Sequence, residues 1–132
     1  MLGMVMNMNF ADEVIERLSR VAPGVRGRKM FGGVGIYSGE QFFALVAFDR
    51  LWLKVDDSNR DDYEARGMTP FQPFPDRPTT MSYYEFPPEL LDQPDELRGW
   101  AMRSIAIARN KSNRNKSRTT NPQQTKQQRK NQ

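Results

Sequence analysis

Three glycines stand within the stretch RKMFGGVGIY (28–37), and clustered glycines are the residues that cradle phosphates in nucleotide-binding proteins. A Walker loop needs a Gly-Lys pair between a strand and a helix, and the chain contains no such pair. A dinucleotide-binding loop must open a helix, whereas Gly33 and Gly35 are followed by further strand-like sequence. Glycines inside a strand typically mark a bend, a bulge or a close backbone approach. These glycines are therefore predicted to be architectural.

Other chemistry is limited by composition. The chain has no cysteine and no histidine, so it lacks thiolate and imidazole metal ligands as well as the commonest general base. One acidic cluster comprises Asp56, Asp57, Asp61 and Asp62. It lacks the glycine that a calcium loop carries at its sixth position, and the dipole of a helix N-terminus explains the acids. The sequence predicts no catalytic, cofactor-binding or metal-binding residue.

Four aromatic residues raise the question of nucleic-acid recognition: Tyr37, Trp52, Tyr83 and Tyr84. On a sheet they could form a base-stacking platform like that of sheet-based RNA-binding proteins. Residues 1–108, however, carry 12 Lys and Arg against 16 Asp and Glu, so the body of the protein is net acidic. Hydrophobic packing is therefore the favoured interpretation of these rings.

The positive charge lies in the C-terminal segment, where residues 109–132 hold eight Lys or Arg and no acid. Residues 110–132 contain no aliphatic or aromatic side chain, so they cannot offset their ordering entropy by burial. We expect a disordered basic tail over 111–132 that binds nucleic acid weakly and without sequence preference. The predicted contacts are Arg109, Lys111, Arg114, Lys116, Arg118, Lys126, Arg129 and Lys130.

The other end, residues 1–9, is apolar but has no basic region or cleavage site typical of a secretory signal. We expect it to be a flexible N-terminus. No run approaches the roughly 18 apolar residues of a membrane-spanning helix. The expected location is the cytoplasm, with no membrane partner.

The periodicity between the termini predicts an α+β domain over residues 10–110. Helices are expected from Asn9 as cap to Pro23, from Ser58 to Gly67 with a capping box at Ser58 and Asp61, and from Pro94 to about Arg109. Strand-like runs occupy 30–37, 42–48, 51–56 and 81–86. The links are too short for parallel crossovers, so we expect an antiparallel meander of about four to five strands with flanking helices, in the order α-β-β-β-α-β-α. The run 42–48 is apolar on both faces and should be the central strand.

Four segments in this order resemble the N-terminal domain of the TfoX/Sxy competence-regulator family: RKMFGGVGIY, FFALVAFDRLWLKVDD, MSYYEFPPELL and LRGWAMRSIAIAR. The resemblance spans about residues 10–110. It implies an α+β domain with an antiparallel sheet and, in founding members, a coactivator of DNA-uptake genes that acts with a cyclic-AMP receptor protein. Those members carry a helical C-terminal domain, and at that place in this sequence we expect the basic tail.

The resemblance brings no agreed catalytic or ligand residue. Its motif positions in this chain are Met30, Phe31, Gly32, Gly33, Gly35, Leu53 and Lys54. We interpret them as structural. Lys54 is the exception, because strand alternation points it away from the face shared by Leu51 and Leu53. It is interpreted as a solubilising charge, with a contact residue as the alternative.

The leading hypothesis is a non-enzymatic, TfoX-like regulatory or adaptor domain that contacts a protein of the transcription machinery or a regulator and requires no cofactor. A homodimer is expected, since a sheet apolar on both faces needs a cover. The alternatives are a small-ligand or carboxylate-based catalytic module, a nucleic-acid-tethered accessory protein acting through its basic tail, and a tail that only solubilises.

Overall fold

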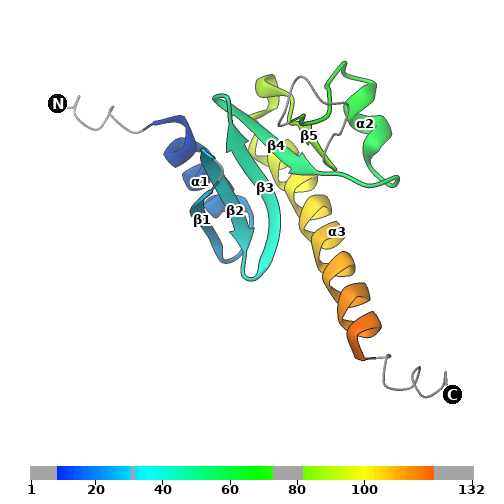
Figure 1. Ribbon diagram of the computed structural model, residues 1–132. Coiled ribbons are helices and arrows are strands. Elements are labelled where there is room, and N and C mark those ends of the chain that lie inside the picture. The colour runs from blue at the N-terminus through cyan, green and yellow to red at the C-terminus, as the bar shows by residue number, and fades with distance from the viewer. Residues whose placement is uncertain (1–8, 31, 73–81, 121–132) are drawn as a thin grey trace, which may run out of the picture.

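Short links make each strand run antiparallel to the one before it, and the computed structural model, which describes residues 9–30, 32–72 and 82–120, has one five-stranded antiparallel sheet. Its elements are α1 (Phe10–Val21), β1 (Val25–Met30), β2 (Gly33–Ser38), β3 (Gln41–Ala47), β4 (Arg50–Lys54), α2 (Arg60–Glu64), β5 (Tyr83–Glu85), the 3-10 turn η2 (Pro88–Leu90) and α3 (Pro94–Thr120). The strands lie in the order β1-β2-β3-β4-β5 (Figure 1). The expected α+β class is confirmed.

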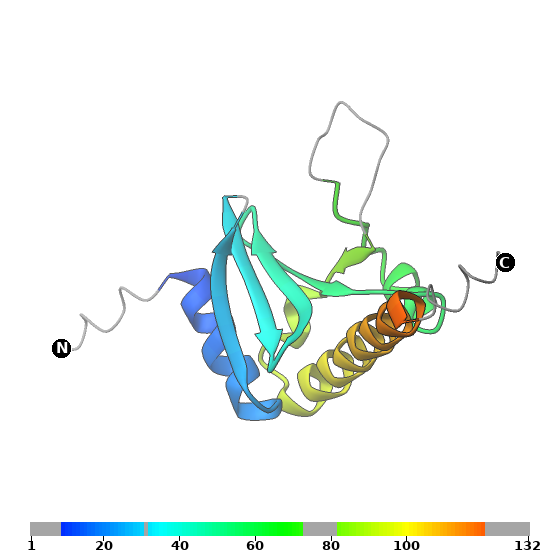
Figure 2. The same cartoon turned by 60° about the horizontal axis from the view of Figure 1, so that its bottom comes forward.

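The helices α1 and α3 lie on the same side of the sheet (Figures 1 and 2). The other face, called the open face because neither helix covers it, is turned to the viewer of Figure 1. The helix-covered face holds the main core, to which α1 contributes Val14 and Leu18, and α3 contributes Leu97 and Ile105. Asn9 caps α1 as expected, because its Oδ1 accepts a hydrogen bond from the Asp12 N–H at 2.9 Å.

Strand β3 is the central strand, as its apolar pattern predicts. Ala44 and Val46 join the core beneath the helices, whereas Phe42, Leu45 and Ala47 pack on the open face around Trp52. The register between β2 and β3 shifts by a β-bulge between the pairs Ile36↔Ala44 and Tyr37↔Phe42. The bulge allows Phe42 to lie on the open face although Ala44 lies in the core. Both faces of β3 therefore carry apolar contacts, which is why neither side of this run is polar.

The expectation of one strand over 30–37 is wrong. Gly32 has φ +78°, a left-handed conformation, and the chain reverses there between two strands in unbroken register from Val25↔Ser38 to Met30↔Gly33. The added strand, β1, has the sequence VRGRKM. It lacks the apolar alternation that identifies a strand, because it lies at the edge of the sheet with four exposed residues in succession, 26–29.

Two helix boundaries also differ from expectation. Ser58 does not cap α2: its N–H and Oγ bind the Asp56 carboxylate, and the N-cap residue is Asn59. Helix α3 continues to Thr120 instead of ending near Arg109, because lysine and arginine are good helix formers and no proline or glycine interrupts residues 100–120. Residues 121–132 of the expected disordered tail lie outside the described residues.

Tyr63 on α2 is a buried contact between α2 and α3, 1% exposed, with its ring edge-on to Trp100 at 4.7 Å between centroids. Its hydroxyl has no hydrogen-bond partner within the described residues, and the neighbouring Ser104 hydroxyl donates to the Lys54 carbonyl. Burial raises the pKa of Tyr63 well above its ordinary value. The phenol therefore carries an uncompensated desolvation cost.

Replacing Tyr63 by Phe should stabilise the protein by about 1 kcal/mol, because the substitution removes that unsatisfied hydroxyl and keeps the ring. The matched control is Tyr84→Phe, which should cost about 1 kcal/mol, because the Tyr84 hydroxyl donates to Glu64 Oε2 at 2.8 Å. Urea unfolding of the two variants measures both values. A clear loss of stability in Tyr63→Phe would contradict this assignment.

Candidate interaction surface

The glycine-rich motif lies at the β1–β2 turn. Gly33 and Gly35 both have ordinary strand dihedrals, so close packing and not left-handed backbone keeps them small. A Cβ on Gly33 would lie 2.3 Å from the Val46 carbonyl oxygen of the neighbouring strand. A Cβ on Gly35 would lie 2.6 Å from the terminal methyl carbon of Met30. The glycines serve strand packing, and Phe31 lies outside the described residues.

Leu53 and Lys54 end strand β4. Leu53 is fully buried in the main core. Lys54 does point away from Leu53, as alternation predicts, but the expected exposed charge is wrong: Lys54 is 8% exposed, with its ammonium 5.0 Å from the centroid of the Tyr83 ring. Desolvation, with the nearby Lys111 as a further cause, lowers the pKa of Lys54. The cover comes from β5, a strand distant in sequence.

The main-chain carbonyl of Lys54 is a junction between three elements. It accepts a hydrogen bond from Ser104 Oγ of α3 at 2.7 Å and another from Asn59 Nδ2, at the start of α2, at 3.3 Å. All three residues are buried. Their polar groups satisfy one another and fix where α3 crosses the sheet.

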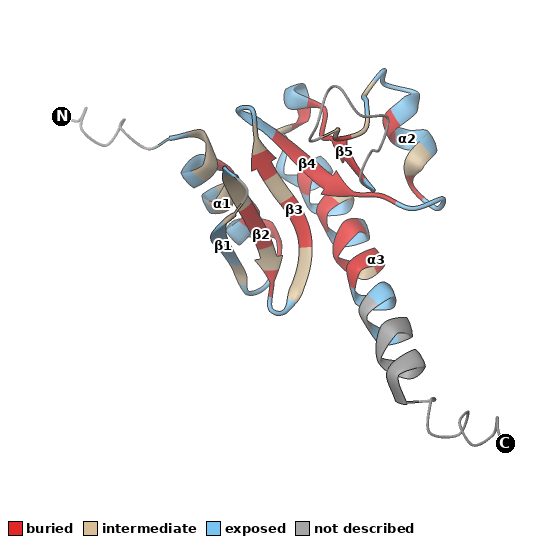
Figure 3. Cartoon of the chain, in the orientation of Figure 1, coloured by how far each residue is buried: buried red, intermediate tan, exposed pale blue. Residues whose placement is uncertain are grey.

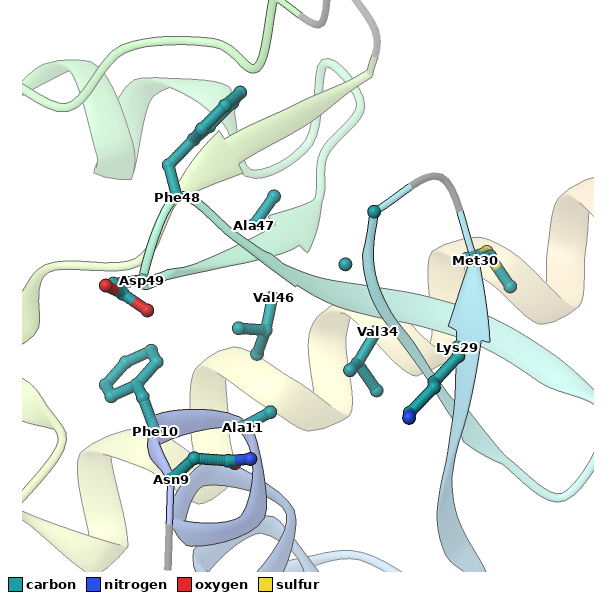
Figure 4. Close-up of a pocket in the computed structure, with 12 residues that line it drawn as sticks. Asn9, Phe10, Ala11, Lys29, Met30, Val34, Val46, Ala47, Phe48 and Asp49 are labelled. Atoms are coloured by element: carbon teal, nitrogen blue, oxygen red, sulfur yellow. The ribbon is translucent and has the colours of Figure 1, made fainter.

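A groove of about 680 Å³ lies between the first turn of α1, the β1–β2 turn and the β3–β4 turn (Figure 4). Its floor is apolar, from Phe10, Val34 and Val46. The ionisable side chains are Lys29 and Asp49, which lie on opposite sides of the groove in Figure 4. They do not converge on a common point, as an acid–base pair would.

The β3–β4 turn at the rim of this groove is strained. Phe48 and Asp49 both have φ 56°, the left-handed conformation at both central positions of a two-residue type I′ hairpin, which Asn-Gly normally occupies. Phe48 is 68% exposed, and its ring centroid lies 6.1 Å from that of Phe71. The Trp52 indole N–H donates to the Ala47 carbonyl at 3.1 Å and holds the turn.

The aromatic residues of the open face form a row across the strands. Tyr37 stacks on Phe42 at 5.2 Å between centroids, and Phe42 lies 5.7 Å from Tyr83. The Arg26 guanidinium lies over the Tyr37 ring, 4.8 Å from its centroid. The rings thus present their faces to one another, whereas a base-stacking platform needs a free ring face. Tyr84 lies in the main core, on the opposite side of the sheet.

The acidic cluster after β4 is divided between a turn, with Asp56 and Asp57, and the first turn of α2, with Asp61 and Asp62. Ser58 donates to the Asp56 carboxylate, which lowers the pKa of Asp56, and Arg60 pairs with Asp57. Within the described residues, no group of three or more Asp or Glu side chains is placed to hold a metal ion. The described part of the chain likewise includes no helix long and apolar enough to cross a bilayer.

The basic positions of the C-terminal segment divide into three sets. Arg109 and Lys111 are exposed on α3. Arg114, Lys116 and Arg118 belong to the same helix. Lys126, Arg129 and Lys130 lie outside the described residues. Phe48 and Arg26 are exposed residues that the sequence did not identify as candidates for binding. The signal for Phe48 was a large apolar residue at a chain reversal.

The arrangement defines a small α+β domain in which the motif residues Leu53 and Lys54 are buried and Gly33 and Gly35 allow close packing of the strands. A family model, the TfoX N-terminal domain, matches residues 16–108, and the chain belongs to this family. No curated protein matches the chain significantly.

Substitution of Gly33 by Ala should destabilise the protein by about 2–3 kcal/mol, because the added methyl meets a backbone oxygen that cannot move alone. Gly35→Ala is the matched control and should cost about 1 kcal/mol or less, because the Met30 side chain can turn away. Chemical denaturation measures the free energy of unfolding of both variants and shows which substitution costs more. Equal costs would show that strand bending, and not the Val46 carbonyl, selects glycine.

Substitution of Phe48 by Asn should raise stability by about 0.5–1 kcal/mol, because asparagine adopts the left-handed conformation at lower cost and the exposed ring has little to lose. Thermal unfolding measures the change. The control is Phe42→Asn on the same sheet, which should destabilise. A fall in stability for Phe48→Asn would mean that the Phe71 contact outweighs the backbone strain.

Proposed function

We propose that this chain is a non-enzymatic regulatory or adaptor domain that acts in the cytoplasm through protein–protein contacts in transcription regulation. Its resemblance to competence regulators supports the regulatory role. The observation that carries the protein contact is Phe48, a large apolar ring 68% exposed on a turn whose backbone favours another residue. A residue kept at a cost in stability, in an exposed position, is typical of a binding contact.

The proposed contact surface is the Phe48 turn with the adjoining grooves. The first is the groove of about 680 Å³ between α1 and the two turns. The second, of about 390 Å³, shares Phe10, Phe48 and Asp49 with it and extends to Leu91. Exposed aromatic side chains beside apolar hollows are the usual anchors of protein interfaces. The proposed partner is a protein of the transcription machinery or a regulator, and a second copy of this chain is the alternative occupant.

The rival function, a small-ligand or carboxylate-based catalytic module, has less support. Of the polar side chains around the larger groove, Asn9 is engaged in capping α1, and Lys29 and Asp49 lie apart. A catalytic pair needs two groups within hydrogen-bond reach of one reacting atom. We therefore place the function in binding.

Site-specific photo-crosslinking tests the proposal. The photoreactive residue p-benzoylphenylalanine would replace Phe48 in the full-length chain, expressed in its native cell with and without nuclease treatment of the lysate. The matched control carries the same residue at Met102, an exposed apolar position on α3. We expect a discrete protein adduct from position 48 that is absent from position 102 and resists nuclease.

The mass of the adduct distinguishes the occupants. An adduct of twice the chain mass, also formed by the purified protein, identifies a homodimer, and any other discrete mass identifies a separate protein partner. Identical patterns from both positions, or an adduct lost after nuclease treatment, would overturn the proposed protein contact at this turn.

We further propose that the basic C-terminal segment holds the domain near nucleic acid without reading sequence. Its cations Arg109 and Lys111 are exposed on α3, just after the buried Ile107 and Ala108. The C-terminal end of α3 extends past the sheet (Figure 1). Both cations lie in a segment without aromatic side chains, so they can neutralise phosphates but not stack on bases.

Replacing Arg109 and Lys111 by Gln should reduce the log–log salt slope of duplex binding by about 1.8, since each lost phosphate contact contributes about 0.9. The control is Arg98→Gln/Arg66→Gln, which removes the same charge elsewhere on the surface. Fluorescence anisotropy against random duplex at several salt concentrations measures the slopes. Equal slopes for the two double variants would contradict the assignment to α3.

A further inference from the structure

The two edges of the sheet are not equivalent. The outer side of β5 is covered, because the backbone of residues 69–71 pairs with it: the Phe71 N–H donates to the Tyr83 carbonyl at 2.7 Å, and the Glu85 N–H to the Thr69 carbonyl at 3.1 Å. The outer side of β1 has no such cover within the described residues. Its residues 26–29 are exposed in succession at the left edge of the sheet (Figure 3).

Strand β1 has the geometry to accept a further strand. It is six residues long, contains no proline, and pairs with β2 in unbroken register. Alternate residues of an edge strand direct N–H and C=O groups outward, and a row of such unpaired groups is a template for another chain. The β-bulge, which would twist an edge away, lies between β2 and β3.

The charge on β1 has one sign. Arg26 and Arg28 are two residues apart and point to the open face, and Lys29 points to the other. None of the three has an ion-pair partner in the described part of the chain. Positive charge protects an edge against a second copy of itself, since like charges opposite one another on paired strands repel. The same charge attracts an acidic strand.

We propose that β1 binds an extended acidic segment of a partner protein by strand addition, with carboxylates at alternate positions facing Arg26 and Arg28. Backbone hydrogen bonds to the outer edge of β1 hold the segment, and the two guanidinium groups select it. Lys29 and Met30 at the end of β1 line the groove beside the Phe48 turn, but Arg26 and Arg28, which carry this proposal, do not. Neither proposal depends on the other.

Glu40, in the β2–β3 turn, is exposed and forms no ion pair with β1 among the described residues. The body of the protein is net acidic, so an acidic peptide is repelled in general and attracted only locally. Binding is therefore expected to be weak, salt-sensitive and confined to the β1 edge.

A short capped peptide in which glutamate alternates with valine tests the proposal against the full-length chain at low salt. Three related peptides are the controls: one with lysine in place of glutamate, one with scrambled order, and one N-methylated at the amides facing β1. Calorimetry measures affinity, and amide hydrogen exchange locates the bound edge. We expect binding of the glutamate peptide alone, with added protection at residues 25–30.

The charge-swap variant Arg26→Glu/Arg28→Glu should bind the glutamate peptide at least about tenfold more weakly and should gain binding of the lysine peptide. The matched variant Arg66→Glu/Arg98→Glu changes the net charge equally, at the turn after α2 and on α3, and should leave the preference for the glutamate peptide unchanged. If the swap variant fails to fold by thermal unfolding, the N-methylated peptide on the native chain decides the question.

Three results would overturn the proposal. The first is no binding of the glutamate peptide at low salt, which would make β1 a protected edge only. The second is equal affinity for the N-methylated peptide, which would mean charge attraction without strand pairing. The third is an equal loss of affinity for the glutamate peptide in Arg26→Glu/Arg28→Glu and in Arg66→Glu/Arg98→Glu. All three leave the crosslinking result at Phe48 unaffected.

Discussion

The arrangement of this domain depends on one buried acceptor, the main-chain carbonyl of Lys54. Strand β4 ends there, and its last carbonyl would otherwise lie buried without a partner. Ser104 of α3 and Asn59 before α2 both donate to it, so a single oxygen fixes where the long helix crosses the sheet and where the chain turns back from β4. A buried carbonyl without these donors would cost about 1–3 kcal/mol, which explains why small polar residues occupy two otherwise apolar positions.

This junction changes the interpretation of the TfoX-type motif. Leu53 fills the core, Lys54 lies over the Tyr83 ring while its carbonyl holds two helices, and Gly33 lets β2 approach the Val46 carbonyl. These three motif residues serve the interior of the domain, whereas the motif residue Gly32 is exposed at the β1–β2 turn. Phe48 and Arg28 fall within the segments that resemble the family, but Phe48, Arg26 and Arg28 are not among its motif positions. The motif positions therefore identify the scaffold, and the side chains proposed to bind are other residues.

Sequence patterns predicted what depends on local periodicity. The amphipathic α1, its Asn9 cap and the doubly apolar β3 follow from residue spacing alone. Strand β1 was not predicted, because an edge strand that carries Arg26 and Arg28 lacks the alternation of apolar and polar residues that indicates a strand. The burial of Lys54 could not be predicted from alternation, since the covering residue, Tyr83, comes from a distant strand. Phe48 could not be assigned to a left-handed turn, because its Phe-Asp pair replaces the usual Asn-Gly signal.

The most direct test of the view that motif residues build the scaffold while exposed residues bind is the Lys54→Met variant carrying the crosslinker at position 48. Methionine keeps the stem of the side chain, and the carbonyl junction involves no side-chain atom of Lys54. We predict an undiminished melting temperature, because removing a desolvated charge offsets the lost contact with Tyr83, and an unchanged yield of the protein adduct. A folded Lys54→Met protein that no longer forms the adduct would contradict this view and make Lys54 a contact residue.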